Sequence, residues 1–191
     1  MANVPSAAKF PYIRRMTTRP LTIAERVLSH AVFGDAIDPD RVWVHRARWF
    51  PLQPRNVVMA PDGAIWCHPD GVLYRACYAA APLDMRALFV HEMVHVWQAQ
   101  TRGRWYLPLM RHPFCRYAYR LDPGRPFARY GIEQQAEMVA DAFLVAHGIA
   151  RPGGLSMADY RAVLPFPIRL GGAADGVSGF PAPAAQATAR P

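Results

Sequence analysis

The sequence predicts an α+β domain in which short antiparallel strands precede two longer helices. Turn residues punctuate residues 38–80 at short intervals, and this spacing favours strands. Apolar residues recur with helical spacing over residues 83–101 and 132–147. Hydrophobic residues make up 52% of the chain and charged residues 19%, which is typical of a folded protein and excludes a wholly disordered one.

The chain is expected to hold one folded domain over residues 19–170, between two irregular ends. Residues 1–18 are polar and basic without periodicity, so we expect a flexible N-terminal arm. In residues 171–191, 14 of 21 residues are Ala, Gly or Pro, which predicts a disordered tail. Neither a signal peptide nor a transmembrane span is visible, so synthesis in the cytoplasm is expected, and any export would use a signal-peptide-independent system.

The strands are expected in the first half of the domain, after one helix. That helix starts behind a capping residue, Thr22, ends at Gly34, and should bury Ile23, Val27, Leu28, Ala31 and Val32. Alternation around Val42 and Val44 predicts a strand, and residues 56–68 predict a hairpin around Pro61-Asp62-Gly63. A second turn at residues 69–71 predicts one more short strand after it.

The second half is expected to contain two long helices and an irregular connection. One helix follows Pro82 and runs to about Thr101, and the other covers residues 132–148. The connection, residues 104–131, is rich in proline, aromatic residues and arginine, with a strand or short helix expected near residues 115–121. A short helix is expected within residues 156–164.

The basic residues point only weakly to an anionic partner. The net charge is +8, from 22 basic and 14 acidic residues, and Lys9 is the single lysine. The arginines are scattered and form no recognisable nucleic-acid module, so nucleic-acid binding is disfavoured. The three cysteines contain no C-x-x-C pair, which argues against a cysteine zinc site.

A metal site is indicated by His91-Glu92-Met93-Val94-His95 inside the helix that follows Pro82. Side chains four residues apart lie on one face of a helix, so the two imidazoles can converge on one zinc ion. Glu92, beside the first histidine, is placed to take a proton from an attacking water. Neighbouring apolar residues indicate that this motif faces the inside of the domain.

A catalytic zinc needs a third protein ligand, and the later helix offers three carboxylates. Glu133, Glu137 and Asp141 are spaced by four residues and share one face. Like charges so placed destabilise a helix, and a divalent cation would compensate them. The spacing alone leaves open which of these carboxylates would be the third ligand.

The pair His91-Glu92-x-x-His95 and Glu137-Met138-Val139-Ala140-Asp141 resembles the gluzincin group of zinc metallopeptidases. This resemblance implies a small zincin-like domain, one Zn²⁺ held by His91, His95 and Glu137, and Asp141 as the residue that orients a ligand histidine. Glu133, one turn before Glu137, is the alternative ligand, and Glu137 is preferred because only that choice leaves an aspartate four residues later. Residues 19–38, 91–100 and 130–143 look like the small Vgr-related metallopeptidases associated with type VI secretion and related contractile injection systems.

The sequence does not decide which side chain stabilises the oxyanion that forms during peptide hydrolysis. The connection supplies four candidate donors, His112, Tyr117, Tyr119 and Tyr130. An open strand edge before Pro82 could pair with an extended peptide substrate through backbone hydrogen bonds.

The favoured function is zinc-dependent hydrolysis of a peptide or protein substrate, in an effector or processing enzyme of a secretion apparatus. The main alternative is a non-catalytic, zinc-stabilised binding or assembly module of that apparatus. Two further alternatives are a basic module that binds nucleic acid or an anionic membrane, and a zinc hydrolase that acts on another kind of bond.

Overall fold

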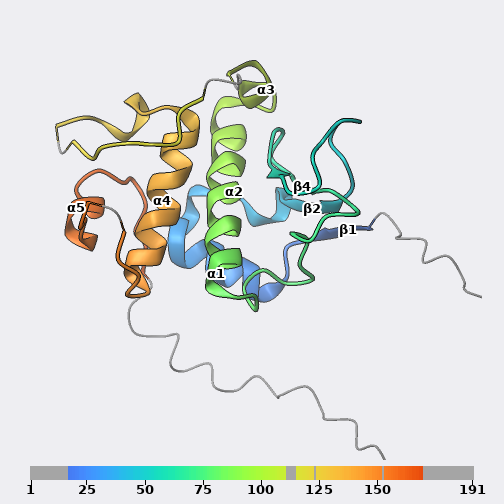
Figure 1. Ribbon diagram of the computed structural model, residues 1–191, viewed down its shortest axis with the longest axis horizontal. Coiled ribbons are helices and arrows are strands. Elements are labelled where there is room, and N and C mark those ends of the chain that lie inside the picture. Colours follow the sequence, from blue (N-terminus) through green and yellow to red (C-terminus); the bar gives the residue numbers. More distant parts are fainter. Residues whose placement is uncertain (1–16, 111–114, 123, 152, 170–191) are drawn as a thin grey trace, which may run out of the picture.

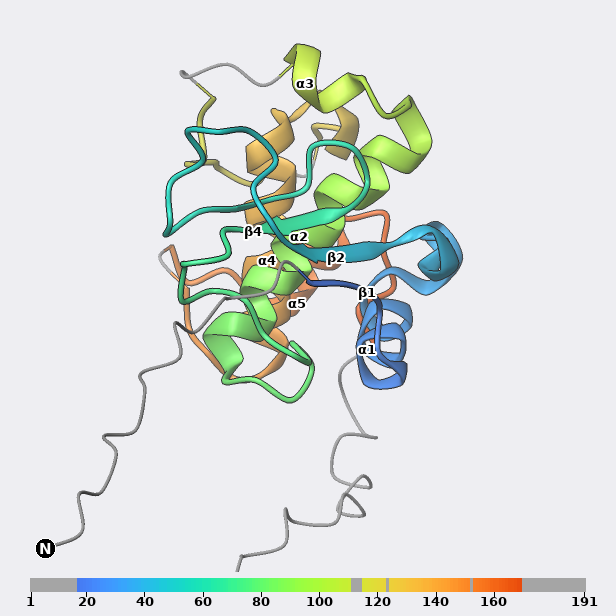
Figure 2. The same ribbon diagram turned by 90° about the vertical axis from the view of Figure 1, so that its right-hand side faces the viewer.

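The computed structural model describes residues 17–110, 115–122, 124–151 and 153–169, which form three layers (Figure 1). Helix α2 (Leu83–Arg102) is the middle layer, with a small sheet on one side and helix α4 (Ile132–Ala146) on the other. The view turned by 90° shows the same order, with the sheet in front of α2 and α4 behind it (Figure 2). The expected α+β class is confirmed, and the zincin-like character stays a prediction.

The sheet has four strands in the order β1-β2-β4-β3, namely β1 (Thr17–Pro20), β2 (Trp43–Arg46), β4 (Ile65–Cys67) and β3 (Val58–Met59). The outer pairs are antiparallel as expected, but β2 and β4 run parallel. Strand β1 begins at Thr17, so Thr17 and Thr18 belong to the sheet and not to the expected arm. The rest of the arm, and the tail, lie outside the described residues.

The expected hairpin around Gly63 is confirmed, and it places β3 at one edge of the sheet. Val58 pairs with Cys67 and Met59 with Trp66. The loop that leads into β3 is held by the buried side chain of Gln53, which accepts a hydrogen bond from the Trp49 amide. The side-chain amide nitrogen of Gln53 donates hydrogen bonds to the carbonyl oxygens of Val57 and Trp66.

A close backbone contact fixes the other side of this loop. The expected turn at residues 69–71 is confirmed by a hydrogen bond from the Gly71 amide to the His68 carbonyl. A Cβ atom at Gly71 would lie 2.1 Å from the carbonyl oxygen of Arg55, so only glycine fits there.

The strand expected after this turn is absent; residues 72–78 are irregular. Side chains form hydrogen bonds with backbone groups of this segment that would otherwise pair with a neighbouring strand. The Arg19 guanidinium donates to the Arg75 carbonyl, and the Tyr78 amide donates to the Glu25 carboxylate. Arg19 also binds both oxygens of Glu25, at 2.7 and 2.8 Å, so one ion pair connects β1, α1 and this segment.

Helix α1 (Ile23–Phe33) has the expected bounds and cap, but it faces the core with a different side. Thr22 and Glu25 form a reciprocal capping box. Glu25 is fully buried, whereas Ile23 is 83% exposed and Val27 64% exposed. The prediction that these two apolar residues face the core was therefore wrong, because the contacts of Glu25 turn its side of the helix inward.

The remaining elements are short. The segment before β2 contains the 3-10 turns η1 (Gly34–Ala36) and η2 (Pro39–Arg41). The connection contains α3 (Tyr106–Met110) and the turn η3 (Phe127–Arg129), and residues 115–122 are irregular, in contrast to the expected strand or helix there. The expected short helix near the end is confirmed as α5 (Met157–Arg161). Within the described ranges, no helix is both long and apolar enough to cross a membrane.

Glu25→Gln should lower the free energy of unfolding by about 3–5 kcal/mol, because it leaves Arg19 without its buried anionic partner. Burial raises the pKa of Glu25, but hydrogen bonds from Arg19, Tyr78 and Thr22 outweigh burial and lower it. The contribution of Glu25 is therefore present above its unfolded pKa of about 4.3 and is lost as the pH falls through the lower folded pKa.

Urea denaturation over a series of pH values tests this expectation. The difference between Glu25→Gln and the unchanged protein should shrink in acid. Asp40→Asn is the matched control, because this exposed carboxylate pairs with Arg26 at the surface and should contribute less than about 1 kcal/mol. Equal losses in both variants would contradict the role given to Glu25.

Candidate metal centre

Both histidines of the H-E-x-x-H motif lie on the face of α2 that meets α4. Their ring centroids are 5.0 Å apart, and His95 is buried. The rest of α2 is packed between the sheet and α4, so the motif lies inside the domain as the sequence predicted.

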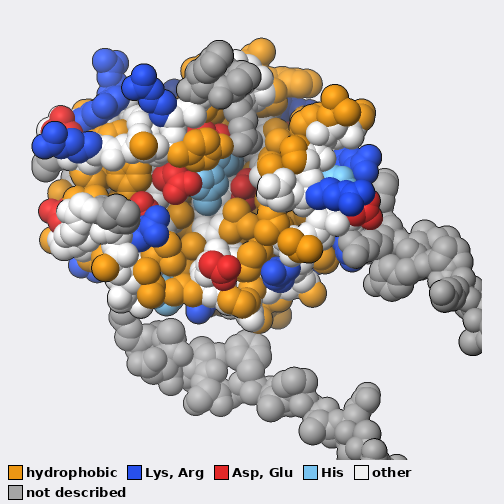
Figure 3. Space-filling model, in the orientation of Figure 1, with side chains coloured by type: hydrophobic (Ala, Val, Ile, Leu, Met, Phe, Trp, Pro, Cys, Tyr) orange, Lys and Arg blue, Asp and Glu red, His pale blue; other side chains and the backbone are white. Residues whose placement is uncertain are grey.

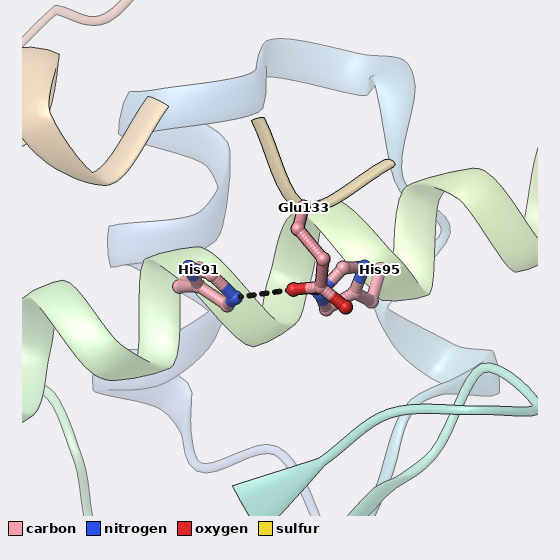
Figure 4. A group of neighbouring side chains, drawn as sticks. All are labelled: His91, His95 and Glu133. Atoms are coloured by element: carbon pink, nitrogen blue, oxygen red, sulfur yellow. Dashed lines mark hydrogen bonds and ion pairs between the residues drawn. The ribbon is translucent and has the colours of Figure 1, made fainter. Parts of the chain in front are cut away.

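The third donor near these rings is Glu133, in the first turn of α4 (Figure 4). Its Oε2 atom lies 3.5 Å from Nε2 of His91 and 3.3 Å from Nε2 of His95. A direct charge-assisted hydrogen bond would be shorter, about 2.7–2.9 Å. Ligands that surround zinc tetrahedrally at about 2.0–2.1 Å are about 3.3–3.4 Å from one another. These two distances therefore fit donors around a zinc-sized ion, and the donor atoms of all three side chains lie within 4.8 Å of one another.

Glu137, the ligand preferred from sequence, lies behind His91 instead of in this group. Its Oε1 atom is 3.4 Å from Nδ1 of His91, the ring nitrogen that faces away from Glu133. Burial is the largest cause that raises the pKa of Glu137, and the charges of Asp141 and Glu133 add to it. The group of possible metal donors in the structure therefore contains Glu133, the alternative ligand, and Glu137 lies beside the other ring nitrogen of His91.

Charge also acts on His91. Burial alone would lower the pKa of this imidazole, but the nearby Glu133 carboxylate and the charges of Glu92 and Glu137 raise it overall. A group of carboxylates around an imidazole attracts a cation, whether a proton or a metal ion.

His95 is oriented by a glutamine that the sequence analysis missed. Nδ1 of His95 is 2.8 Å from Oε1 of Gln98, whose amide nitrogen donates to the Ile132 carbonyl and to Oε1 of Gln135. Gln135 in turn donates to the Tyr130 carbonyl. Because the amide nitrogen of Gln98 is used on α4, its oxygen faces His95 and accepts from Nδ1, which leaves the Nε2 lone pair directed toward Glu133.

In the structure Asp141 contacts Tyr119 and Arg151, and its role as the residue that orients a ligand histidine stays a prediction. It accepts a hydrogen bond of 2.7 Å from the Tyr119 hydroxyl, and its other oxygen lies 2.6 Å from Nε of Arg151. Tyr119 also bonds to the Tyr160 hydroxyl, and its burial, with these hydrogen bonds, raises its pKa. Within the described residues, the carboxylate beside Nδ1 of His91 is thus Glu137, one helical turn before Asp141.

A cavity of about 390 Å³ opens beside this candidate site, and His91 lines it. Figure 3 shows histidine at the bottom of a hollow that acidic side chains flank. Residues 56–58, at and before the edge strand β3, form the wall opposite the helices. The chemical groups on the helical side are His91, Glu92, Tyr117, Glu137, Asp141 and Arg151.

Glu92 lines this cavity although its side chain is almost fully buried, at 4% exposure. Among the described residues, none donates a hydrogen bond to its Oε2 atom. A buried carboxylate oxygen that lacks a protein donor is costly, and a water molecule or substrate in the cavity would supply the donor. Burial, with the charge of Glu92 as a further cause, raises the pKa of the Cys67 thiol to about 11, so that thiol stays protonated at neutral pH.

Of the four expected oxyanion donors, the structure places Tyr117 at the cavity. Its ring stacks on that of His91, with the centroids 6.4 Å apart. The Tyr119 hydroxyl is bound to Asp141 as described above, and the Tyr130 hydroxyl contacts the Asp122 amide and the Arg120 carbonyl. His112 lies outside the described residues. Arg151 is an additional cationic group at the cavity, and no sequence motif singled it out.

Comparisons with known proteins relate the chain to one bacterial protein. No protein-family model matches the sequence. The type VI secretion system spike protein VgrG2b of Pseudomonas aeruginosa is 38% identical over 135 residues, which are 66% of this chain and only 13% of that protein. The solved structure of the effector domain of Pseudomonas aeruginosa VgrG2b matches with a TM-score of 0.60 and 33% identity, over 75% of this chain and 80% of that domain. The chain therefore belongs to the family of the VgrG2b effector domain.

Proposed function

We propose that the chain is a zinc-dependent peptidase whose metal ligands are His91, His95 and Glu133. The observation that carries the proposal is a group of three donor atoms, two of whose separations match a tetrahedral zinc site. Beside it lies the buried Glu92, whose Oε2 atom accepts no hydrogen bond from the described residues. Zinc bound there would supply the Lewis acidity that polarises a peptide carbonyl and makes water acidic near neutral pH.

The protein groups have separate tasks in this proposal. Glu92 takes a proton from the attacking water and returns it to the leaving amine. Glu137 and Gln98 hold the two imidazoles in position through their Nδ1 atoms. Tyr117 is the candidate donor to the oxyanion, because it is the tyrosine of the connection that lines the cavity and stacks on a proposed ligand.

The substrate in this proposal is an extended peptide or an unfolded protein segment. Strand β3 ends the strand order of the sheet, so its outer edge can accept one more strand. Residues 56–58 at this edge line the cavity opposite Glu92. Pairing through backbone groups gives affinity with little dependence on the side chains of the substrate.

The biological setting proposed is type VI secretion. Membership of the VgrG2b effector-domain family supports an effector role, with a spike or another component of the secretion apparatus as partner. Such delivery needs no signal peptide. The alternative, a zinc-stabilised assembly module without catalysis, has the same ligands but leaves the burial of Glu92 without a purpose.

The ligand assignment is tested by the zinc content of two matched variants. Glu133→Ala should lose the bound ion, because it removes one of three donors. Glu137→Ala should keep one zinc with an affinity about 10–100-fold weaker, the usual cost of losing a group that orients a ligand. Zinc is measured by inductively coupled plasma mass spectrometry and by competition with a chelator. The reverse pattern would return the ligand role to Glu137.

Glu92→Gln should keep its zinc and its fold while hydrolysis of an unfolded protein such as reduced casein falls by about 10²–10⁴-fold. Asp35→Asn is the control, because it makes the same chemical change at a fully exposed carboxylate on η1. Wild-type hydrolysis in Glu92→Gln would exclude Glu92 as the base. Zinc-loaded protein that cleaves no peptide substrate at all would favour the assembly module.

Tyr117→Phe should lower kcat by about 10²–10³-fold with little change in KM, because the hydroxyl would act only when negative charge develops on the carbonyl oxygen. Tyr74→Phe is the matched control, because the Tyr74 ring contacts Arg19 and Arg46 and its side chain does not line the cavity. An unchanged kcat in Tyr117→Phe would leave Arg151 as the cavity group to examine for this role.

A further inference from the structure

A cluster of exposed apolar side chains stands at the end of the molecule where α2 leads into α3. Trp105 is 61% exposed, Leu109 80% and Met110 50%. Leu107, between them, is buried against Ala99 and Ile132 and fixes the short helix to the body of the domain. We name Trp105, Leu109 and Met110 the α3 patch. Such a group of large apolar side chains in water is unfavourable unless something covers it.

The residues that neighbour the α3 patch along the chain are basic. Arg104 lies over the Trp105 ring at 5.2 Å, and Arg102 lies 5.9 Å from the centre of the Tyr106 ring. No carboxylate occurs in the sequence between Glu92 and Asp122, a stretch of 29 residues that holds five arginines. The patch therefore combines apolar side chains with positive charge, and its neighbours along the chain carry no negative charge.

We infer that the α3 patch docks on the surface of a membrane that contains anionic phospholipid. Tryptophan beside arginine suits the headgroup layer, where the ring is half immersed and the guanidinium meets phosphate. Leu109 and Met110 would enter the boundary of the acyl chains. Nucleic acid would use the arginines and the tryptophan ring but would leave these two aliphatic side chains exposed to water.

The position of α3 makes such docking sterically simple. Both ribbon views place α3 at one end of the molecule, beyond the end of α2, and α1 at the opposite end (Figures 1 and 2). His95 and Arg102 are seven residues apart on α2, or about 10 Å along the helix. Docking would thus hold the proposed metal centre close to the membrane surface. The inference goes beyond the proposed peptidase and does not depend on zinc.

The test is co-sedimentation of the full chain with vesicles. Vesicles of equal parts phosphatidylcholine and phosphatidylglycerol should bind the protein, and vesicles of phosphatidylcholine alone should bind it at least about tenfold more weakly. Binding is measured with and without a chelator and again in Glu92→Gln. The same partition in all three cases shows that docking is separate from metal binding and catalysis, so failure of one proposal is visible without failure of the other.

Matched variants locate the contact. Leu109→Ser should weaken binding about tenfold. Ile23→Ser is the control and should not change binding, because Ile23 is a side chain of the same size that is 83% exposed on α1, away from the patch. Arg104→Gln should weaken binding to the anionic vesicles about fivefold, and Arg161→Gln on α5 serves as its control. Circular dichroism and thermal melting of each variant confirm that the fold is retained.

Three outcomes would overturn the inference. The first is no binding of the unchanged protein to anionic vesicles. The second is an equal effect of Leu109→Ser and Ile23→Ser. The third is binding to double-stranded DNA that Arg104→Gln weakens and Leu109→Ser leaves unchanged, which would make the arginines part of a nucleic-acid surface.

Discussion

The structure depends on the burial of one carboxylate, that of Glu133, between α2 and α4. Only 1% of this residue is exposed, and two imidazoles stand around it. A buried carboxylate is tolerated only when positive charge and hydrogen bonds compensate it. The face that α4 turns toward α2 is therefore set by electrostatics as well as by apolar packing. A cation at this point would join the two long helices as well as serve chemistry.

The sequence alone was sufficient for the parts that local pattern determines. The bounds of α2, the cap at Thr22 and the hairpin around Gly63 follow from periodicity and turn residues, and all three are present. The alignment of α4 against α2 is not local, and Glu133, Glu137 and Asp141 are equivalent by spacing. The contact of Gln98 with the first turn of α4 decides between them, because it places Glu133 level with the histidines.

The other differences from expectation also come from buried polar groups. Arg19 and Glu25 bind the backbone of residues 75–78, and this removes the strand that the turn chemistry favoured. The same ion pair turns α1 so that Ile23 faces solvent. Hydrophobic patterning treats glutamate as a surface residue, so it has no means of predicting a fold that is organised around two buried carboxylates.

The cavity is built from two kinds of structure, and this division has a consequence for how the family can diverge. The candidate metal donors are carried by α2 and α4, whereas the opposite wall of the cavity is a loop held at Gln53 and Gly71. Insertions and substitutions in the loop leave the helix pair untouched. The wall that faces the cavity can therefore vary through residues near 47–57, while the helix pair and its three candidate donors stay the same.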